Sequence, residues 1–285
     1  ISACLVGSEM CIRDSVCMYR LLAIDLDGTL LTPPPQKIIT PRTHTALCQA
    51  AERGILIVIA TGQTLSVLRN VCAGLPLSAP QIIENGAVIA DIQSGAILHE
   101  KLLPTEYILP TLEILRKIGL YRAYHTHARV YVDKNTPRAR NWYRPPVLPA
   151  VEVEDVASLY PQPCIKVAGI GEASSLREKR FELERHFAGQ LYVTQSSFDI
   201  LEFLQLTVSK GNALRTIAAD LGIPPEEIMA FGDNHNDIGM LRFAGFGVAM
   251  GNAHEEVKAV ADYATLSNSE DGVAVAIEKM VLSQS

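Results

Sequence analysis

The stretch "AIDLDGTLLTP" (Ala23–Pro33) is the part of the sequence from which the fold is best approached. An apolar run ends there on two aspartates, Asp25 and Asp27, and Gly28 follows directly. A continuous apolar run is typical of a strand that is buried on both faces, as in a parallel sheet. Because residues i and i+2 of a strand point the same way, both carboxylates face one side, and Gly28 allows a sharp turn. An ordinary turn or helix cap is the alternative explanation for these aspartates.

Short apolar runs alternate with helix-like stretches before and after the middle third of the chain. Two of the expected helices have clear boundaries, because Thr40 and Pro41 open one and Gly222 follows the other, Lys210–Leu221. This alternation predicts a parallel sheet with crossover helices, and therefore an α/β fold with a Rossmann-like core. The expected core strands cover Arg20–Leu26, Ile55–Thr61, Gln81–Glu84, Ile228–Phe231 and Phe246–Met250.

The middle third interrupts this alternation, since prolines cluster there and one stretch alternates like a half-exposed antiparallel strand. We predict an inserted α+β domain over residues 87–204, which opens with a hairpin. The core is then formed by residues 18–86 and 205–285. His125 and His127 lie on one face of the half-exposed strand, and we interpret that face as solvated.

Composition restricts the possible partners and location. The chain has 285 residues, of which 48% are hydrophobic, and a formal net charge of -6 without a strongly basic stretch, which argues against nucleic acid as a partner. Its longest apolar runs, such as Ile55–Ala60, are far shorter than the ~20 residues that span a bilayer, so we expect no membrane association. None of the six cysteines forms a C-x-x-C pair, which favours reduced thiols and a cytoplasmic protein. Residues 1–17 lack the pattern of a signal peptide, and we expect them to be a non-native or disordered leader.

A second acidic stretch, "GDNHND", contains Asp233 and Asp237 and also follows an apolar strand. If this strand lies beside the first, up to four carboxylates meet at one edge of the sheet together with Asp25 and Asp27. Such crowding is costly unless a cation compensates it, and oxygen-only ligands favour Mg²⁺. The one nitrogen donor in the stretch, His235, is interpreted as a loop residue and not as a ligand.

Other polar residues favour an anion at the same edge. Thr61 and Gly62 end a strand and offer a hydroxyl and backbone N–H groups at a helix start, which suits a phosphate. Lys210 stands at the start of a predicted helix, where the helix dipole disfavours a cation, so an anionic partner would explain it. Asn85 and Gly86 follow the third strand at the junction with the inserted segment. They either contact the substrate or that segment, or they form a plain turn, and the sequence favours neither alternative.

These four polar segments resemble, in the same order along the chain, the four motifs of the haloacid dehalogenase-like phosphatases. The large insertion between the second and third motifs is similar to the cap domain of the Cof-type subfamily, and the resemblance extends from Met18 to the C-terminus. The matching segments are Asp25-Leu26-Asp27-Gly28-Thr29, Thr61-Gly62, Lys210-Gly211 and Gly232-Asp233-Asn234-His235-Asn236-Asp237.

The resemblance implies a role for each matched residue. Asp25 would be the nucleophile that attacks phosphorus, since a carboxylate with a reference pKa of ~3.9 needs no base at neutral pH. Asp27 would be the general acid and then the base, because two nearby carboxyls split their pKa values and a raised value suits an acid. Mg²⁺ would be ligated by Asp25, Asp233 and the main-chain carbonyl of Asp27, with Asp237 as support. The phosphoryl oxygens would be held by Thr61, Asn236 and the catalytic Lys210.

The implied function is Mg²⁺-dependent hydrolysis of a small phosphomonoester through an aspartyl-phosphate. Sugar phosphates are the first substrate class that the resemblance suggests, and phosphorylated cofactors are the second. A sugar phosphomutase and a non-catalytic phosphometabolite-binding protein are the alternatives. Gln63 stands where the subfamily usually has an arginine, which predicts a less anionic leaving group than an arginine-bearing relative would accept.

Overall fold

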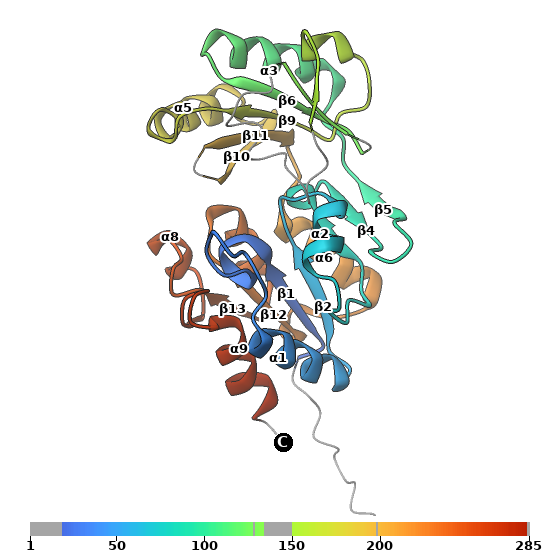
Figure 1. Ribbon diagram of the computed structural model, residues 1–285, viewed down its shortest axis with the longest axis vertical. Coiled ribbons are helices and arrows are strands. Elements are labelled where there is room, and N and C mark those ends of the chain that lie inside the picture. The colour runs from blue at the N-terminus through green and yellow to red at the C-terminus, as the bar shows by residue number, and fades with distance from the viewer. Residues whose placement is uncertain (1–18, 128, 134–149, 198, 284–285) are drawn as a thin grey trace, which may run out of the picture.

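The computed structural model describes residues 19–127, 129–133, 150–197 and 199–283, which form two sheets flanked by helices (Figure 1). The leader that we expected over residues 1–17 lies outside the described residues. The predicted α/β class with a Rossmann-like core is confirmed, because the larger sheet is mostly parallel and the smaller one mostly antiparallel. The inserted sheet lies beyond one end of the core sheet, and its helix α3 (Thr105–Lys117) lies on the side away from the core (Figure 1).

Eight strands form the core sheet within the described part of the chain, in the order β14-β13-β12-β1-β2-β3-β4-β5. The first strand is central, since β1 pairs in parallel with both β2 and β12 and all five of its residues are buried. Strand order therefore reverses at β1, and ligands in open α/β sheets bind at the carboxyl ends of strands at such a point. The strands are β1 (Leu21–Asp25), β2 (Leu56–Ala60), β3 (Gln81–Ile83), β4 (Val88–Ala90), β5 (Ile97–Glu100), β12 (Ile228–Gly232), β13 (Phe246–Ala249) and β14 (Tyr263–Ala264).

Helices cover the core sheet and begin and end where local chemistry requires. The hydroxyl of Thr40 accepts a hydrogen bond from the Thr43 amide at the start of α1, and Ser209 caps α6 in the same way. Gly222 ends α6 with a φ of 62°, a left-handed conformation that suits glycine. The core helices are α1 (Pro41–Glu52), α2 (Leu65–Val71), α6 (Lys210–Leu221), α7 (Ile238–Phe243), α8 (Glu255–Lys258) and α9 (Gly272–Ile277).

The hairpin β4–β5 lies in the core sheet, whereas the sequence placed it in the inserted segment. Strand β4 pairs antiparallel with β3 and is buried in the main hydrophobic core, and β5 pairs with β4 as an exposed edge. The short turn η2 (Glu84–Gly86) leaves no length for a crossover, so the chain folds back beside β3. The core sheet therefore extends to Glu100.

The smaller sheet, which we call the cap sheet, has the strand order β10-β11-β9-β6-β7-β8. Helices α3 (Thr105–Lys117) and α5 (Ala173–His186) bury one face of it around Leu112, Tyr124 and Phe203. Because side chains alternate along a strand, the neighbouring residues on β6, β9 and β11 point to the opposite face. The strands are β6 (Tyr121–His125), β7 (Val130–Val132), β8 (Val151–Glu152), β9 (Lys166–Ile170), β10 (Leu191–Ser197) and β11 (Ile200–Gln205).

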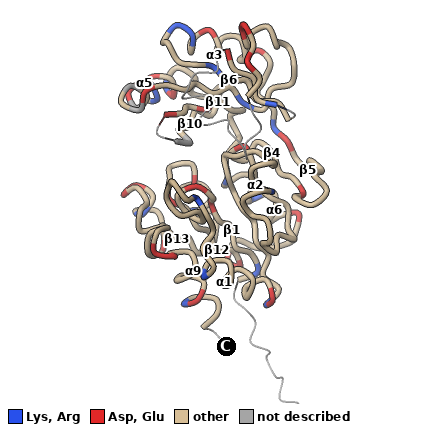
Figure 2. Tube along the Cα trace, in the orientation of Figure 1, with Lys and Arg blue, Asp and Glu red and all other residues tan. Residues whose placement is uncertain are grey.

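Charged residues of both signs are interspersed along both parts of the molecule (Figure 2). Among the described residues, no helix is both long enough and apolar enough to cross a membrane.

Candidate active site

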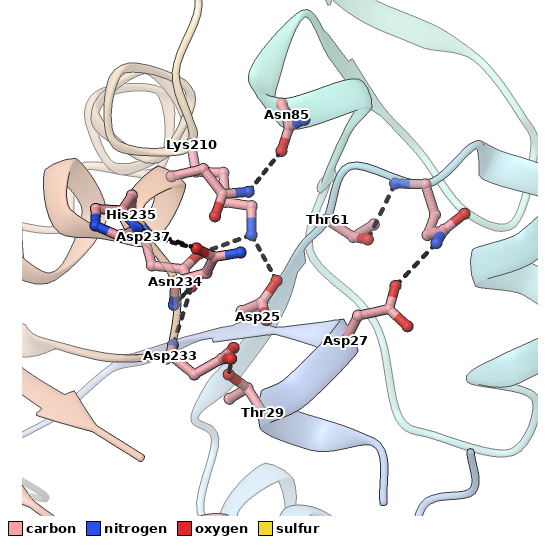
Figure 3. A network of polar contacts seen from close by, with 12 residues as sticks. Asp25, Asp27, Thr29, Thr61, Asn85, Lys210, Asp233, Asn234, His235 and Asp237 are labelled. Atoms are coloured by element: carbon pink, nitrogen blue, oxygen red, sulfur yellow. Dashed lines mark hydrogen bonds and ion pairs between the residues drawn. The ribbon is translucent and has the colours of Figure 1, made fainter. Parts of the chain in front are cut away.

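One buried ammonium group joins two of the predicted carboxylates. Asp25 is the last residue of β1 and is only 4% exposed, and its Oδ1 accepts a hydrogen bond of 2.5 Å from Nζ of Lys210. The same Nζ donates to Oδ1 of Asp237 at 2.7 Å (Figure 3). Lys210 is the first residue of α6, so these two carboxylates account for a cation at a helix start. Burial opposes its charge, but Asp237 and Asp25 raise the pKa of Lys210 above its usual value.

The third carboxylate, that of Asp233, completes the cluster. Oxygen atoms of Asp25, Asp233 and Asp237 lie within 4.8 Å of one another. The hydroxyl of Thr29 donates to Oδ1 of Asp233 at 3.0 Å, which fixes the carboxylate from the turn after β1. Gly28 in that turn has a φ of 86°, and a Cβ there would lie 2.4 Å from Oδ2 of Asp233. Glycine is therefore required for the close approach of the two motifs.

The turn that carries Asp233 is organised by Asp237. Oδ2 of Asp237 accepts backbone hydrogen bonds of 3.0 Å from Asp233 and from Asn234. With its Oδ1 on Lys210, both oxygens of Asp237 have protein partners. Asp237 thus orients Lys210 and the turn η5 (His235–Asp237).

Electrostatics of the cluster favour a cation. Burial, followed by repulsion from Asp237, raises the pKa of Asp25 well above its usual range. The same two causes raise the pKa of Asp233 to about 6, against the hydrogen bond from Thr29. Three carboxylates share one ammonium group, so their ionised form carries excess negative charge. All-oxygen donors of this kind fit Mg²⁺, and the cluster is suited to a divalent cation.

Asp27 lies outside this cluster, although it is two residues from Asp25. Its Oδ1 accepts from Nζ of Lys37 and its Oδ2 accepts from Nε2 of Gln63, both at 2.8 Å. Figure 3 shows Asp27 apart from the network around Lys210. Its expected contribution to the metal is through the main-chain carbonyl, and that stays a prediction.

The predicted phosphate residues lie at the same end of the sheet. Thr61 is buried, and its hydroxyl accepts from the backbone N–H of Gln63 at 3.1 Å (Figure 3). Nδ2 of Asn236 donates to Oδ1 of Asn85 at 2.9 Å, so the end of β3 meets the fourth motif. Gly86 has a φ of 93°, and a Cβ there would lie 2.4 Å from the carbonyl oxygen of the residue before Lys210. The structure therefore packs the predicted junction residues against the site.

Sequence reasoning missed a second charged cluster, between the cap sheet and the core. Nζ of Lys166 on β9 lies 2.6 Å from carboxylate oxygens of Glu84 and of Glu202 and donates to the carbonyl oxygen of Gly62 at 3.0 Å. The side chains of all three charged residues are at most 5% exposed. A charged residue inside an apolar strand, as in "CIKVAGI" and "ILEFLQL", was the signal that could have revealed them.

The interpretation of the two cap histidines is wrong for one of them. His125 is buried, and its Nδ1 lies 3.7 Å from Oε2 of Glu84. His127 is exposed and lies 2.5 Å from Glu100 of the core edge strand. We had interpreted this face of the strand as solvated, because the alternation of polar and apolar residues along a strand does not show that another part of the protein covers the polar face.

This fold and acidic site define a capped α/β hydrolase, and comparison with known proteins identifies the family. A family model described as a haloacid dehalogenase-like hydrolase matches residues 22–277. The chain belongs to this family, and the expected Cof-type membership is confirmed.

Named relatives have one activity in common. A 5-amino-6-(5-phospho-D-ribitylamino)uracil phosphatase from Bacillus subtilis is 34% identical over 263 residues, which cover 92% of this chain and 96% of the relative. A pyridoxal phosphate phosphatase from Escherichia coli is 32% identical over 273 residues, covering 90% and 96%. The structure of a haloacid dehalogenase-like hydrolase from Bacteroides thetaiotaomicron has 32% identity and a TM-score of 0.79 over 92% of this chain and 99% of its own. The protein is a phosphoric monoester hydrolase.

Proposed function

We propose that the protein hydrolyses a small phosphomonoester with Mg²⁺, through a phosphoryl group carried on Asp25. The observation that supports this most strongly is the buried ammonium of Lys210 between Asp25 and Asp237, with Asp233 beside them. The site then combines three parts: a carboxylate nucleophile, a cation that neutralises phosphoryl charge, and a cluster of carboxylates for a divalent cation. When bound, Mg²⁺ would be held by Asp25, Asp233 and the Asp27 carbonyl, and it would neutralise negative charge there.

The reaction proceeds in two transfers. A carboxylate oxygen of Asp25 forms a bond to phosphorus while the ester P–O bond breaks, and Asp27 gives its proton to the leaving alkoxide. Asp27 then removes a proton from water, whose oxygen attacks phosphorus and releases phosphate and the free Asp25 carboxylate. Lys210 stabilises the charge that develops on the phosphoryl oxygens in both transfers.

The position of Asp27 is fixed by the neighbours of its carboxylate. Lys37 and Gln63 bond one oxygen each, which keeps the side chain at the mouth of the site. One of these bonds must be exchanged for the leaving-group oxygen when substrate binds. Gln63 is a neutral donor at the position where the resemblance to the Cof-type subfamily implies an arginine, so we infer that the mouth favours a leaving group without a second phosphate.

The remaining predicted residues bind the phosphoryl group or its surroundings. Thr61 offers its hydroxyl together with the backbone of Gly62, and Asn236 offers an amide N–H. We infer the substrate class from the relatives: a phosphorylated sugar or polyol, as the name of the ribitylamino phosphatase suggests, or a phosphorylated cofactor such as pyridoxal phosphate.

Turnover of a chromogenic phosphomonoester by the purified protein, with Mg²⁺ and with a chelator, tests the proposal. We expect activity with Mg²⁺ only, and its loss in Asp25→Asn, since an amide is a poor nucleophile. Phosphate release from a sugar phosphate without an isomerised sugar phosphate excludes the phosphomutase alternative. If Asp25→Asn keeps most of the Mg²⁺-dependent turnover, the assignment of the nucleophile is wrong.

A further inference from the structure

A chain of buried polar contacts runs from the cap sheet into the phosphate side of the site. Oε1 of Glu202 is paired with Lys166, and its Oε2 accepts a hydrogen bond from Nδ2 of Asn85. Oδ1 of Asn85 in turn accepts from Nδ2 of Asn236 at 2.9 Å. We call these four residues the amide relay. Two of them, Lys166 and Glu202, come from the cap sheet, and two come from the core.

The chemistry of each member fixes the orientation of the next. An ionised carboxylate only accepts hydrogen bonds, so Glu202 must face the NH₂ end of the Asn85 amide. The carbonyl end of Asn85 then faces Asn236 and can only accept from its NH₂ group. A protonated or neutral residue in place of Glu202 could donate instead, and the side-chain amides of Asn85 and Asn236 could then each rotate by half a turn, which exchanges their C=O and NH₂ ends.

Lys166 holds Glu202 in place by an ion pair of 2.6 Å. Its ammonium group has three donors, and these meet Glu202, Glu84 and the carbonyl oxygen of Gly62. The contact with Gly62 also fixes the loop that follows Thr61.

We propose that Glu202, held in place by its ion pair with Lys166, is a positioning residue that sets the amide orientation of Asn85 and, through it, of Asn236. This rests on the proposed function, which assigns an N–H of Asn236 to a phosphoryl oxygen. An amide turned the other way would offer its carbonyl oxygen, which repels a phosphoryl oxygen. The cap thus acts on phosphate binding through the relay.

Glu202→Gln tests the relay, because glutamine keeps the shape of the side chain but can donate as well as accept. We expect KM for a chromogenic phosphomonoester and the inhibition constant of inorganic phosphate to rise about tenfold together, as for loss of one hydrogen bond to a charged group. The value of kcat should change less than about threefold, since ground-state and transition-state binding weaken alike. Glu100→Gln is the matched control, because Glu100 meets the cap residue His127 at 2.5 Å outside the relay and should leave both constants unchanged.

A double-mutant cycle keeps the test decisive if Glu202→Gln lowers stability. Asn85→Ala removes the middle of the relay, so Glu202→Gln should have no further effect on KM or on phosphate inhibition in that background. Equal, additive losses in the two backgrounds overturn the relay. It is also overturned if folded Glu202→Gln has the wild-type phosphate inhibition constant, or if Glu100→Gln raises it equally. Failure of the proposed function would appear differently, as absence of turnover by the wild-type protein.

Discussion

Two clusters in this molecule have the same arrangement, in which a buried lysine lies between two carboxylates. They differ in the number of carboxylates nearby, and therefore in net charge. Lys210 lies 2.5 and 2.7 Å from Asp25 and Asp237 in the core, and Lys166 lies 2.6 Å from both Glu84 and Glu202 at the cap. The geometry is nearly the same in both places. Among the residues that the structure describes, the core cluster has a third carboxylate, Asp233, within 4.8 Å of the other two, and no such third carboxylate joins the cap cluster.

That difference appears in the pKa values of the acids. In the core cluster, burial and repulsion raise the pKa of Asp25 and of Asp233. In the cap cluster, burial also opposes ionisation, but Lys166 and His125 outweigh it and lower the pKa of Glu84 to about 2. With every carboxylate ionised, the cap cluster has two carboxylates for one ammonium group, whereas the core cluster has three. The comparison indicates that the core cluster carries the larger excess of negative charge and is the one that a bound cation would stabilise more.

Substitution of the two lysines should give the largest contrast. Lys210→Met removes the charge that we propose to contact the phosphoryl group, and we expect kcat to fall about 10²- to 10³-fold, as for other lost transition-state donors. Lys166→Met acts through the relay and through the loop at Gly62, and it should raise KM while kcat stays within about tenfold. Steady-state kinetics on folded variants, checked by circular dichroism, measure both effects. Equal losses of kcat in the two variants would show that the clusters do not differ in function.

Neutralising one acid in each cluster should change stability in opposite directions. In chelator at pH 7.5, Asp233→Asn removes repulsion and should raise the free energy of unfolding. It should also abolish the stabilisation that Mg²⁺ gives the wild type, which is about 2.7 kcal/mol at 100 times Kd. Glu84→Gln removes a carboxylate that is directly paired with Lys166, and it should cost about 1–3 kcal/mol with or without Mg²⁺. Thermal and denaturant unfolding measure these changes, and destabilisation of the chelated protein by Asp233→Asn would contradict the excess charge.

The pH dependence should also have opposite signs. Asp233 titrates at about 6 in the folded protein and near 4 when unfolded, so the metal-free native state holds an extra proton between these values. The stability that this group contributes therefore falls as the pH rises from about 4 to 6. Glu84, with a pKa of about 2, contributes stability above about pH 4.5 that is lost as the pH falls towards 2. Unfolding in chelator from pH 2.5 to 8, compared with Asp233→Asn and Glu84→Gln, separates the two slopes.

The sequence predicted the core cluster because its residues follow apolar strands in recognisable motifs. Asp25, Asp233, Asp237 and Lys210 meet as expected, since the carboxyl ends of parallel neighbours share one edge. The α/β class followed from the same periodicity. The division of the chain into a core domain and a cap domain stays a prediction. The predicted position of the β4–β5 hairpin was wrong, because the sequence of a short strand does not show which sheet it will pair with.

The cap cluster could not be predicted, because Lys166 and Glu202 belong to strands of the inserted segment without a recognised motif, and Glu84 lies in a turn of the core. Lys166 and Glu202 come from different strands of the cap sheet, and Glu84 comes from the core. A sequence shows that each is a charge in an apolar context, but not which charges meet. That information depends on how the cap sheet is placed on the core, which local patterns do not encode.

The mouth of the site, between the two clusters, should give the smallest effect. Gln63 donates to Oδ2 of Asp27 at 2.8 Å, and Lys37 donates to Oδ1, so Gln63→Arg would add a second cation beside this carboxylate. The added charge should favour substrates with a second anionic group, because the guanidinium can bind it at a half-exposed site. We expect kcat/KM for a sugar bisphosphate relative to the monophosphate to rise about fivefold, the ~1 kcal/mol of a partly exposed ion pair. Gln63→Met, which lacks both donor and charge, should leave the ratio unchanged, and a wild-type preference for bisphosphates would contradict the role assigned to Gln63.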